Sequence, residues 1–461
     1  MSYSCFAELI TIAGVSLVGM PRKVKGHMSL RSYLSNLKQS NQLLSIKTPI
    51  SKTYEIAGLL KQVEPRPALF ERVRETEFRV AGNLFCSKAA FASYFGVPVS
   101  GIIPLLVAAI ADRRPCELVD GGPCQEVVDL HPDLDRLPIL RHCERDGGNY
   151  ISSGVMIARH PQWGQNVDFH RLMQFSKNEM AVRVVRSRHF DAFLRDLGSV
   201  EVAVCVGLPP NVLAAAATSV ELGVDELEIA NALEPLQVVH ARTADVCVPA
   251  ESEFVLEGTV TLERTHSEGP FVDLTETYDV VREEPVFTVK AVTYRRDAIW
   301  HALLPGALEH KLLMGMPREP TIFRKVNEVV RCLDVNVNPG GCSWLHVIVQ
   351  IDKQHEDDGQ KAIAAAFAGH SSAKHVFVVD DDIDIYNPLE VEWALATRFQ
   401  GDRDLVIKAR EQGSSLDPSA EAGTHFTAKM GFDLTKPLVA KGKSFEKAPF
   451  PDVDLARFLP E

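Results

Sequence analysis

The stretch that most constrains how this chain can fold is 145–171, RDGGNYISSGVMIARHPQWGQNVDFHR. The Asp-Gly-Gly at 146–148 predicts a compact turn, because glycine accepts positive φ without a Cβ clash. The run 150–159 is rich in β-forming residues, and 160–165 carries the proline and glycine of a connection. Together with the alternating run 166–171, these segments predict a β-hairpin.

The second strand of this hairpin is unusually polar. Strand alternation divides its side chains between the two faces of a sheet, with Asn166, Asp168 and His170 on one face and Val167, Phe169 and Arg171 on the other. A buried arginine and polar groups this dense are unfavourable unless they are paired. The hairpin is therefore predicted to carry a functional site.

Length and composition set the broad class. With 461 residues, the chain is too long for one ordinary core, so two or three domains are expected. Its 46% apolar and 24% charged residues are typical of a soluble globular protein. A net charge of −12 disfavours general nucleic-acid binding, which requires basic surface.

Cysteine usage and the N-terminus indicate a cytoplasmic protein. The nine cysteines form no CxxC pair, which favours a reducing compartment. No apolar run reaches the roughly 18 residues that a membrane span needs. Residues 1–27 carry Glu8 inside their apolar stretch and their basic residues after it, which argues against a secretory or organelle-targeting signal.

The order of predicted elements divides the chain into three domains, 28–118, 119–318 and 319–461. In the first, helices and short strands alternate, which predicts an α/β domain. In the second, strands dominate, which predicts a barrel or α+β domain. The elements expected in the first domain are helices at 28–41 and 55–63 and strands at 44–50, 68–70 and 78–84.

The third domain again alternates between strands and helices. Its expected elements are helices at 319–333, 360–368 and 389–398 and strands at 345–351, 374–380 and 405–407. This βαβα order predicts a small, largely parallel sheet. Residues 409–461 show no sustained period, so an extended tail is expected there.

Three further stretches place polar side chains at predicted strand ends: 187–189, 267–273 and 301–311. Each alone is weak evidence, since a single loop charge or histidine is usually structural. In order along the chain, however, RDGGNYISSG, NVDFHR, RSRH, VPAESEFVLEGTV, SEGPFVD and AKHVFVVDDDIDIYNPLEVEWALATR resemble the UbiD family of reversible decarboxylases. The resemblance covers about residues 30–436.

The resemblance implies a cofactor and a chemistry. Family members bind prenylated FMN in a central split β-barrel domain and reversibly decarboxylate aromatic, heteroaromatic or α,β-unsaturated carboxylic acids. The catalytic positions correspond to Arg171, Glu268 and Asp273. Arg171 pairs with Glu268 and can receive the substrate carboxylate in a forked geometry, while Asp273 is expected to donate a proton to the carbon that loses CO₂. The alternative is a structural ion pair between hairpin and loop.

In the family, a divalent metal, Mn²⁺ or Mg²⁺ with K⁺ nearby, holds the cofactor phosphate. Asn166 and His189 occupy two of the ligand positions, and Gln237 stands where the family has a glutamate. A glutamine amide can ligate a hard cation but brings no charge, so weakened metal binding is expected unless Glu228 or Glu234 takes its place. The cofactor contacts implied by the resemblance are Asn166, Ser152, Ser153, His189 and Arg171.

The implied partners are a small carboxylic acid, CO₂ and a flavin prenyltransferase that supplies the cofactor, with no nucleic acid and no membrane. A homodimer or hexamer is expected. Two alternatives stay open: a UbiD-fold protein without prenylated-flavin activity, such as an assembly subunit, and a plain FMN-dependent reductase.

Overall fold

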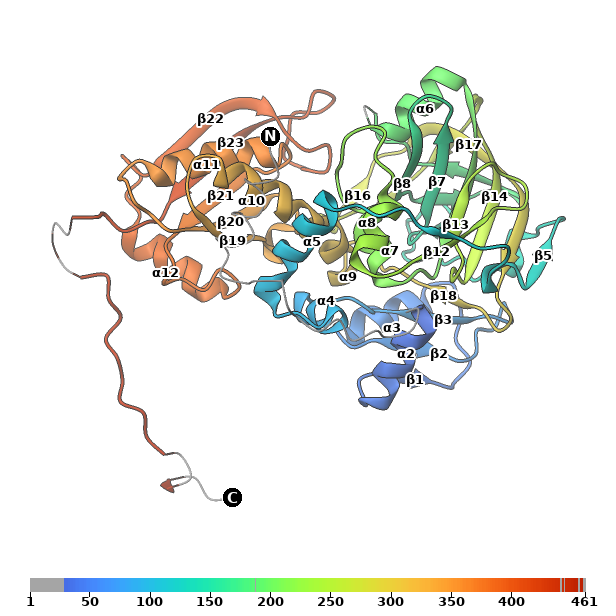
Figure 1. Ribbon diagram of the computed structural model, residues 1–461, viewed down its shortest axis with the longest axis horizontal. Coiled ribbons are helices and arrows are strands. Elements are labelled where there is room, and N and C mark those ends of the chain that lie inside the picture. Colours follow the sequence, from blue (N-terminus) through green and yellow to red (C-terminus); the bar gives the residue numbers. More distant parts are fainter. Residues whose placement is uncertain (1–28, 187, 440–441, 443, 455–456, 459–461) are drawn as a thin grey trace.

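The computed structural model describes residues 29–186, 188–439, 442, 444–454 and 457–458. They form a mixed α/β protein of several domains, and Figure 1 shows the C-terminal part (orange) on the left, a large central part (teal to yellow) on the right and the N-terminal part (blue) below the central part. The predicted fold class is confirmed. The boundaries at 118 and 318 stay a prediction, and the interpretation of residues 1–27 concerns a segment outside the described residues.

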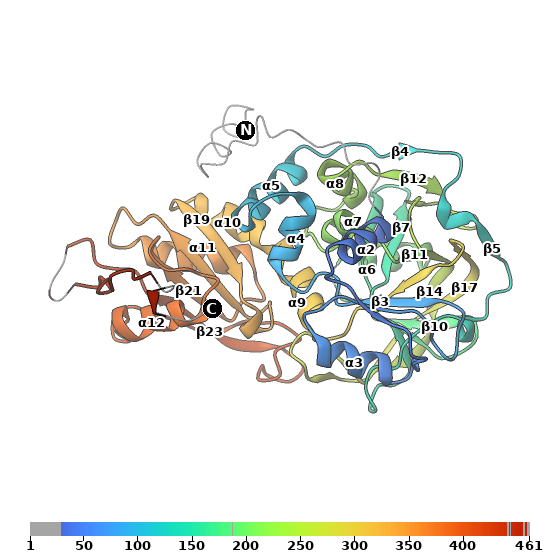
Figure 2. The ribbon, with the colours of Figure 1, turned by 90° about the horizontal axis from the view of Figure 1, so that it is seen from below.

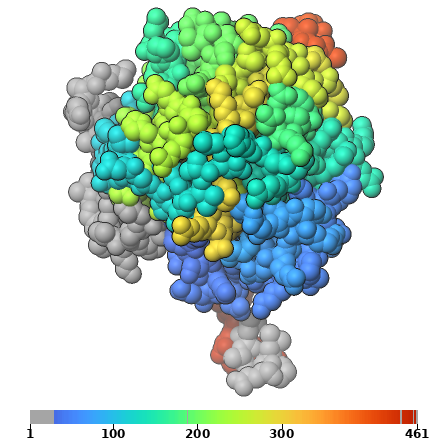
Figure 3. Space-filling view, turned by 90° about the vertical axis from the view of Figure 1, so that its right-hand side faces the viewer, coloured from blue at the N-terminus to red at the C-terminus, as the bar shows by residue number. Residues whose placement is uncertain are grey.

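The N-terminal domain contains a four-stranded sheet ordered β1-β2-β3-β18. Its elements are β1 (Leu44–Ile46), β2 (Ala68–Phe70), β3 (Arg79–Gly82), β18 (Ile299–His301), α2 (Leu30–Gln39), α3 (Glu55–Val63), α4 (Lys88–Phe95) and α5 (Ile102–Ala111). The two expected helices and three expected strands are present, α2 with the Ser29 cap. β18 comes from far along the chain and pairs with β3, which joins this domain to the central one, and Figure 3 shows the two packed together.

α4 and α5 escaped sequence-based prediction. α5 contacts both α8 and α10, so it bridges the central and C-terminal domains (Figure 2). In the described part of the chain no single helix could cross a membrane, and one bent pair, α4 with 99–111, passes on length and composition only.

The central domain is built on a nine-stranded antiparallel sheet. Its strands are β5 (Val127–Asp129), β6 (Asn149–Ile151), β7 (Val155–His160), β8 (Gly164–Phe169), β9 (Leu172–Gln174), β10 (Glu179–Val182), β11 (Ser199–Val206), β14 (Phe254–Glu268) and β17 (Arg282–Tyr294). Its helices are α6 (His189–Leu197), α7 (Pro210–Ala216), α8 (Glu226–Leu233) and α9 (Leu308–Gly315). Two smaller sheets contain β4 (Glu117–Leu118), β12 (Gln237–His240) and β13 (Cys247–Pro249), and β15 (Phe271–Val272) and β16 (Tyr278–Asp279).

Both faces of the central sheet are buried. In β7, Val155 and Ile157 belong to the core that includes α7 and α8, whereas Met156 and Ala158 pack in the core that includes α6. A strand buried on both faces reads as a continuous apolar run. This explains why β7 and β11 appear in the sequence as strong strand signals.

The strand order shows that this sheet curls into a half-barrel. In the order β6-β9-β10-β17-β14-β11-β7-β8, β6 and β9 lie at one end and β7 and β8 at the other. Residues 152–154 alone connect β6 to β7, and 170–171 alone connect β8 to β9. Links this short span only about 7–11 Å, so the two ends of the sheet lie side by side. We call residues 152–154 and 170–171 the seam.

The seam corrects the predicted hairpin. The first strand, expected over 150–159, is broken at 152–154, and the second ends at Phe169 rather than Arg171, because the chain changes strand partners there. The predicted alternation holds within β8: Val167 enters the core, and Asp168 faces away and bonds His170 at 2.9 Å. Arg171 lies beyond the strand.

The C-terminal sheet has the order β19-β20-β21-β23-β22. Its elements are β19 (Cys332–Val337), β20 (His346–Ile351), β21 (His375–Val379), β22 (Leu405–Gln412), β23 (Phe426–Asp433), α10 (Glu319–Asn327), α11 (Asp358–Gly369) and α12 (Pro388–Arg398). β20, β21 and β23 are parallel, but both edge strands are antiparallel, so the prediction of a largely parallel sheet is right only for its centre.

Two expectations for this domain are wrong. The helix expected to reach 333 ends at Asn327, whose Oδ1 accepts from the N–H of Cys332 at the start of β19. The tail expected from 409 includes β23, and the described chain extends away from the domain only after it (Figure 1). Gly431 made β23 resemble a loop, but this glycine is required because a Cβ there would lie 2.2 Å from Ile363 of α11.

Candidate active site

Arg171, in the seam, is the centre of a buried charge cluster. Its Nε and Nη2 donate to the two oxygens of Glu268 at 2.9 Å each, which is a bidentate pair. Its Nη1 donates to Asp273 and its Nη2 to Asp279, also at 2.9 Å. Burial by itself lowers the pKa of Arg171, but the three carboxylates outweigh it and raise that pKa. The structure thus brings together the three residues predicted to be catalytic.

The loop after β14 brings these carboxylates to the seam. Glu268 ends β14, and Gly147 N–H donates to the carbonyl of Pro270 at 2.9 Å. Gly147 is required for this close approach, because a Cβ at residue 147 would lie 2.2 Å from Gly269 O. Positive φ is not the reason for the glycines of the turn, since neither Gly147 nor Gly148 has positive φ. The Phe271 ring then stacks on Tyr150 with centroids 3.9 Å apart.

The two predicted acids differ in access. The Glu268 side chain is fully buried, whereas that of Asp273 is 20% exposed. Asp273 Oδ1 also accepts from the Leu274 N–H, which fixes its orientation. Of the two, Asp273 is therefore the one that a bound molecule can reach.

Arg171 has little capacity left to receive a substrate carboxylate. Four of its five N–H groups donate to Glu268, Asp273 and Asp279, which leaves one on Nη1. Forked reception of a second carboxylate would require one of these acids to move. That role of Arg171 stays a prediction.

Two further members of the site are not among the predicted cofactor, metal or catalytic residues. Asp279 bonds both Arg171 and Arg282, and these arginines lower its pKa although burial opposes them. His310 in α9 accepts from the Gly306 N–H through Nδ1 at 3.0 Å, and burial lowers its pKa while Asp273 and Arg171 act on it electrostatically. The family resemblance places His310 near the substrate without a chemical role. Nothing in the sequence distinguished Asp279 from a solvated loop acid.

Asn166 and His189 lie in contact, as predicted. Asn166 precedes Arg171 by five residues, and His189 begins α6. His189 Nδ1 lies 3.1 Å from Asn166 Oδ1, and Asn166 Nδ2 is buried without a hydrogen-bond partner among the described residues. Gln237 is engaged elsewhere, because its Nε2 donates to Glu117 on β4 at 2.8 Å. The fold provides no bond between Gln237 and the other two predicted metal ligands.

A carboxylate that sequence reasoning did not consider lies next to Asn166. Glu226, the first residue of α8, is buried and accepts from the N–H of Val167, the neighbour of Asn166, at 2.8 Å. Burial raises the pKa of Glu226 well above its usual value, and Asp168 and Asp225 raise it further. The described residues contain no group of three His, Cys, Asp or Glu side chains able to hold an ion, so a metal here needs the Asn166 amide.

The seam serines form hydrogen bonds within the protein. Ser152 Oγ donates to Leu303 O at 2.5 Å, and Ser153 Oγ donates to His301 O at 2.6 Å. Their hydroxyl protons are used to tie the seam to β18 and the segment after it. A cofactor can still use their remaining lone pairs or the seam backbone.

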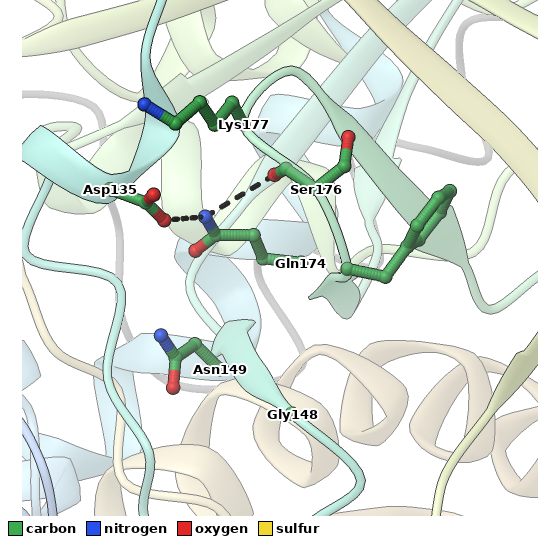
Figure 4. Close-up of a pocket in the computed structure, with 7 residues that line it drawn as sticks. Asp135, Gly148, Asn149, Gln174, Ser176 and Lys177 are labelled. Carbon is green, nitrogen blue, oxygen red and sulfur yellow. Dashed lines mark hydrogen bonds between the residues drawn. The ribbon is translucent and has the colours of Figure 1, made fainter.

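One surface pocket of the central domain is separate from this site. Figure 4 shows a polar pocket beside β6 and β9, where Gln174 donates to Asp135 at 2.7 Å. Its lining residues are Asp135, Gly148, Asn149, Gln174, Phe175, Ser176 and Lys177. None of the residues predicted to bind cofactor or metal or to act in catalysis lines it.

Comparison with known proteins assigns the class of enzyme. Models of the N-terminal, Rift-related and C-terminal domains of 3-octaprenyl-4-hydroxybenzoate carboxy-lyase (UbiD) match residues 34–110, 117–308 and 311–434. The anhydromevalonate phosphate decarboxylase of Methanosarcina mazei is 40% identical over 92% of this chain and 100% of its own length. The corresponding protein of Methanocaldococcus jannaschii is 38% identical over 87% and 96%.

The structure of the UbiD-class enzyme HmfF from Pelotomaculum thermopropionicum in complex with FMN matches with a TM-score of 0.90 and 38% identity, over 94% of this chain and 100% of that one. The matched domains and the shared fold define the class of this protein, a carboxy-lyase. The chain belongs to the UbiD family of decarboxylases. The roles of its individual site residues stay predictions.

Proposed function

We propose that this enzyme decarboxylates a phosphate-bearing α,β-unsaturated acid, such as anhydromevalonate phosphate, with prenylated FMN as cofactor. The observation that carries the proposal is the seam, where Arg171 holds three carboxylates, next to strand β8, whose Asn166 meets His189 of α6. The names of the relatives at 40% and 38% identity support the substrate, and a related structure is titled as containing prFMN.

The residues present fit the cofactor and its metal. The amide oxygen of Asn166, the imidazole of His189 and the buried carboxylate of Glu226 form an oxygen and nitrogen donor set that suits Mn²⁺ or Mg²⁺. We assign the charged ligand to Glu226 in place of Gln237, because Glu226 is buried and bonded to Val167, the neighbour of Asn166, whereas Gln237 is bonded to Glu117. When bound, the prenylated flavin would supply an electrophilic carbon that accepts the electron pair released with CO₂.

The chain's own residues would then act on the proton. Asp273 is the acid accessible from solvent, and its proton would pass to the carbon that has lost CO₂. The resulting carboxylate is held by Arg171 Nη1 until water returns a proton to it. Glu268, fully buried and paired in bidentate fashion, would keep the guanidinium in place throughout.

The test is turnover by protein co-produced with a flavin prenyltransferase. Release of CO₂ from anhydromevalonate phosphate is expected from the wild-type enzyme and is expected to be abolished by Asp273→Asn with flavin still bound. Mass spectrometry of the extracted cofactor identifies the flavin. Bound prenylated FMN with no turnover of this acid or of a panel of aryl and enoic acids would contradict the proposal, and unmodified FMN with NAD(P)H oxidation would indicate a reductase.

A further inference from the structure

A second buried arginine lies outside the Arg171 cluster. Arg318 ends the 3-10 turn Met316–Arg318 that continues α9, just before α10. Its Nε is buried and has no hydrogen-bond partner among the residues that the structure describes. No described carboxylate forms an ion pair with it, and the one charged group that acts on its pKa is another cation, Arg188.

The surroundings of Arg318 are electropositive. Its guanidinium lies over the Trp344 ring, 5.2 Å from the centroid, and the Trp344 carbonyl is 2.9 Å from His370 Nε2. Arg188, the exposed residue that precedes α6, also forms no ion pair with a described residue. Burial and then Arg188 lower the pKa of Arg318 to about 9, and burial, Arg318 and Arg188 contribute to a pKa of about 3 for His370.

A buried guanidinium nitrogen without a hydrogen-bond partner, as at Arg318 Nε, is unfavourable, and the second cation that acts on it, Arg188, adds repulsion. One bound anion would relieve both effects. The planar fork of arginine matches the oxygens of phosphate and carboxylate groups, and a phosphate dianion carries more charge to neutralise two cations. The arrangement therefore suits a phosphate monoester.

Arg318 lies close enough to the Arg171 cluster for one small substrate molecule to reach both. His310, which borders Asp273 and Arg171, and Arg318 lie on one helical segment, eight residues apart. A helical rise of 1.5 Å per residue separates them by about 12 Å. Since an arginine side chain reaches several ångströms back from its backbone, a short acid with its carboxylate near Arg171 can place a terminal phosphate near Arg318.

We propose that Arg318, with Arg188 beside it, binds a second, non-reacting anionic group of the substrate, a phosphate monoester. The proposal rests on the proposed function, because it assumes that the acid is decarboxylated at the seam. The phosphate of the flavin is the other source of the same chemistry. The experiment has to separate these sources.

Three variants of the enzyme co-produced with a flavin prenyltransferase provide the test. Arg318→Met removes the charge and keeps a long side chain over Trp344, Arg318→Lys keeps the charge without the fork, and Arg66→Met removes an exposed arginine of the N-terminal domain as a control. The measured quantity is kcat/KM for anhydromevalonate phosphate divided by kcat/KM for unphosphorylated anhydromevalonate. Arg318→Met is expected to lower this ratio roughly 10- to 100-fold, mainly through KM, and Arg318→Lys by less. Arg66→Met should leave it unchanged.

Two further measurements make the outcome decisive. Flavin content per protein is expected to be equal in Arg318→Met and wild type; a loss of flavin would assign the anion to the cofactor and overturn the proposal. Calorimetry with methyl phosphate needs no turnover and should show binding that Arg318→Met weakens at least tenfold. Such binding without turnover of either acid would refute the proposed function alone, whereas an unchanged ratio or unchanged methyl phosphate binding would refute the anion site.

Discussion

Two buried arginines of this molecule have opposite surroundings. Arg171 donates to three carboxylates, whereas Arg318 has no described carboxylate partner and faces another cation. The first centre is saturated by the protein itself, so it can hold carboxylates in position and manage a proton without a ligand. The second has no counter-charge among the described residues, and we propose that a bound molecule supplies it.

Glu226 is the acidic counterpart of Arg318. It is a buried carboxylate whose charged neighbours are Asp168 and Asp225, and no described cation pairs with it. The proposed metal site and the proposed anion site thus share one feature, the lack of a described counter-charge. The catalytic centre is marked by the reverse, a dense and complete network.

Arg171→Met tests the saturated centre and has the largest expected effect. The change leaves Glu268 buried without its partner, so the free energy of unfolding should fall by about 3–5 kcal/mol. kcat/KM should fall at least about 1,000-fold, because the proton donor and its partner lose their common anchor. Urea denaturation and CO₂ release measure the two effects.

Arg183→Met is the matched control, since it breaks a buried Arg183–Glu284 pair of 2.8 Å in the same domain. It should lower stability comparably and reduce activity far less. Comparable loss of activity in both variants would mean that Arg171 acts through stability alone.

Glu226→Gln and Gln237→Glu together test whether Glu226, the buried carboxylate without a described cation partner, binds the metal. Removing the charge of Glu226 should weaken Mn²⁺ binding roughly 10- to 100-fold in an EPR titration. Gln237→Glu should change it little, because residue 237 faces Glu117 and a new carboxylate would meet like charge. If Gln237→Glu raised the affinity for Mn²⁺ and Glu226→Gln left it unchanged, the third metal ligand would be residue 237.

The difference between the Arg171 cluster and the two groups without a counter-charge, Arg318 and Glu226, explains which parts of the site could be predicted from the sequence. Motif order predicted the family, the fold class and the meeting of Arg171 with Glu268 and Asp273, because those residues lie in recognisable strings. Glu226 escaped because it lies inside an ordinary helix start, and Arg318 because a missing partner leaves no local pattern. Both depend on burial, which only the packed domains create.

β23 and the seam show the same limit for the fold. Gly431 looked like a loop residue until α11 was packed over it, and the strand expected over 150–159 looked continuous until the sheet closed. Local propensity predicts the elements, but tertiary packing decides where a strand is broken or a glycine is required.

Acid should destabilise the region around Arg318. The pKa of His370 is lowered to about 3, so between pH 6.5 and 3 the unfolded chain binds the proton and the folded one does not. Stability contributed by the neutral ring is complete above pH 6.5 and is lost as pH falls, by about 2 kcal/mol at pH 5. Urea denaturation of wild type and His370→Gln at pH 7 and pH 5 measures this, and the variant should lose less by that amount. Equal losses would exclude His370 as the cause.

Asp279→Asn tests whether the Arg171 centre is truly saturated, and its expected effect is the smallest. Arg171 keeps its bidentate bond to Glu268 and its bond to Asp273, and the new amide oxygen can still accept from Nη2. We therefore expect kcat/KM to fall only about two- to tenfold, with flavin content unchanged. A loss as large as that of Asp273→Asn would mean that all three carboxylates are needed and that the third sets the geometry of the proton donor. No loss at all would show that two carboxylates suffice to neutralise Arg171, and that Asp279 serves Arg282, 2.6 Å away, instead.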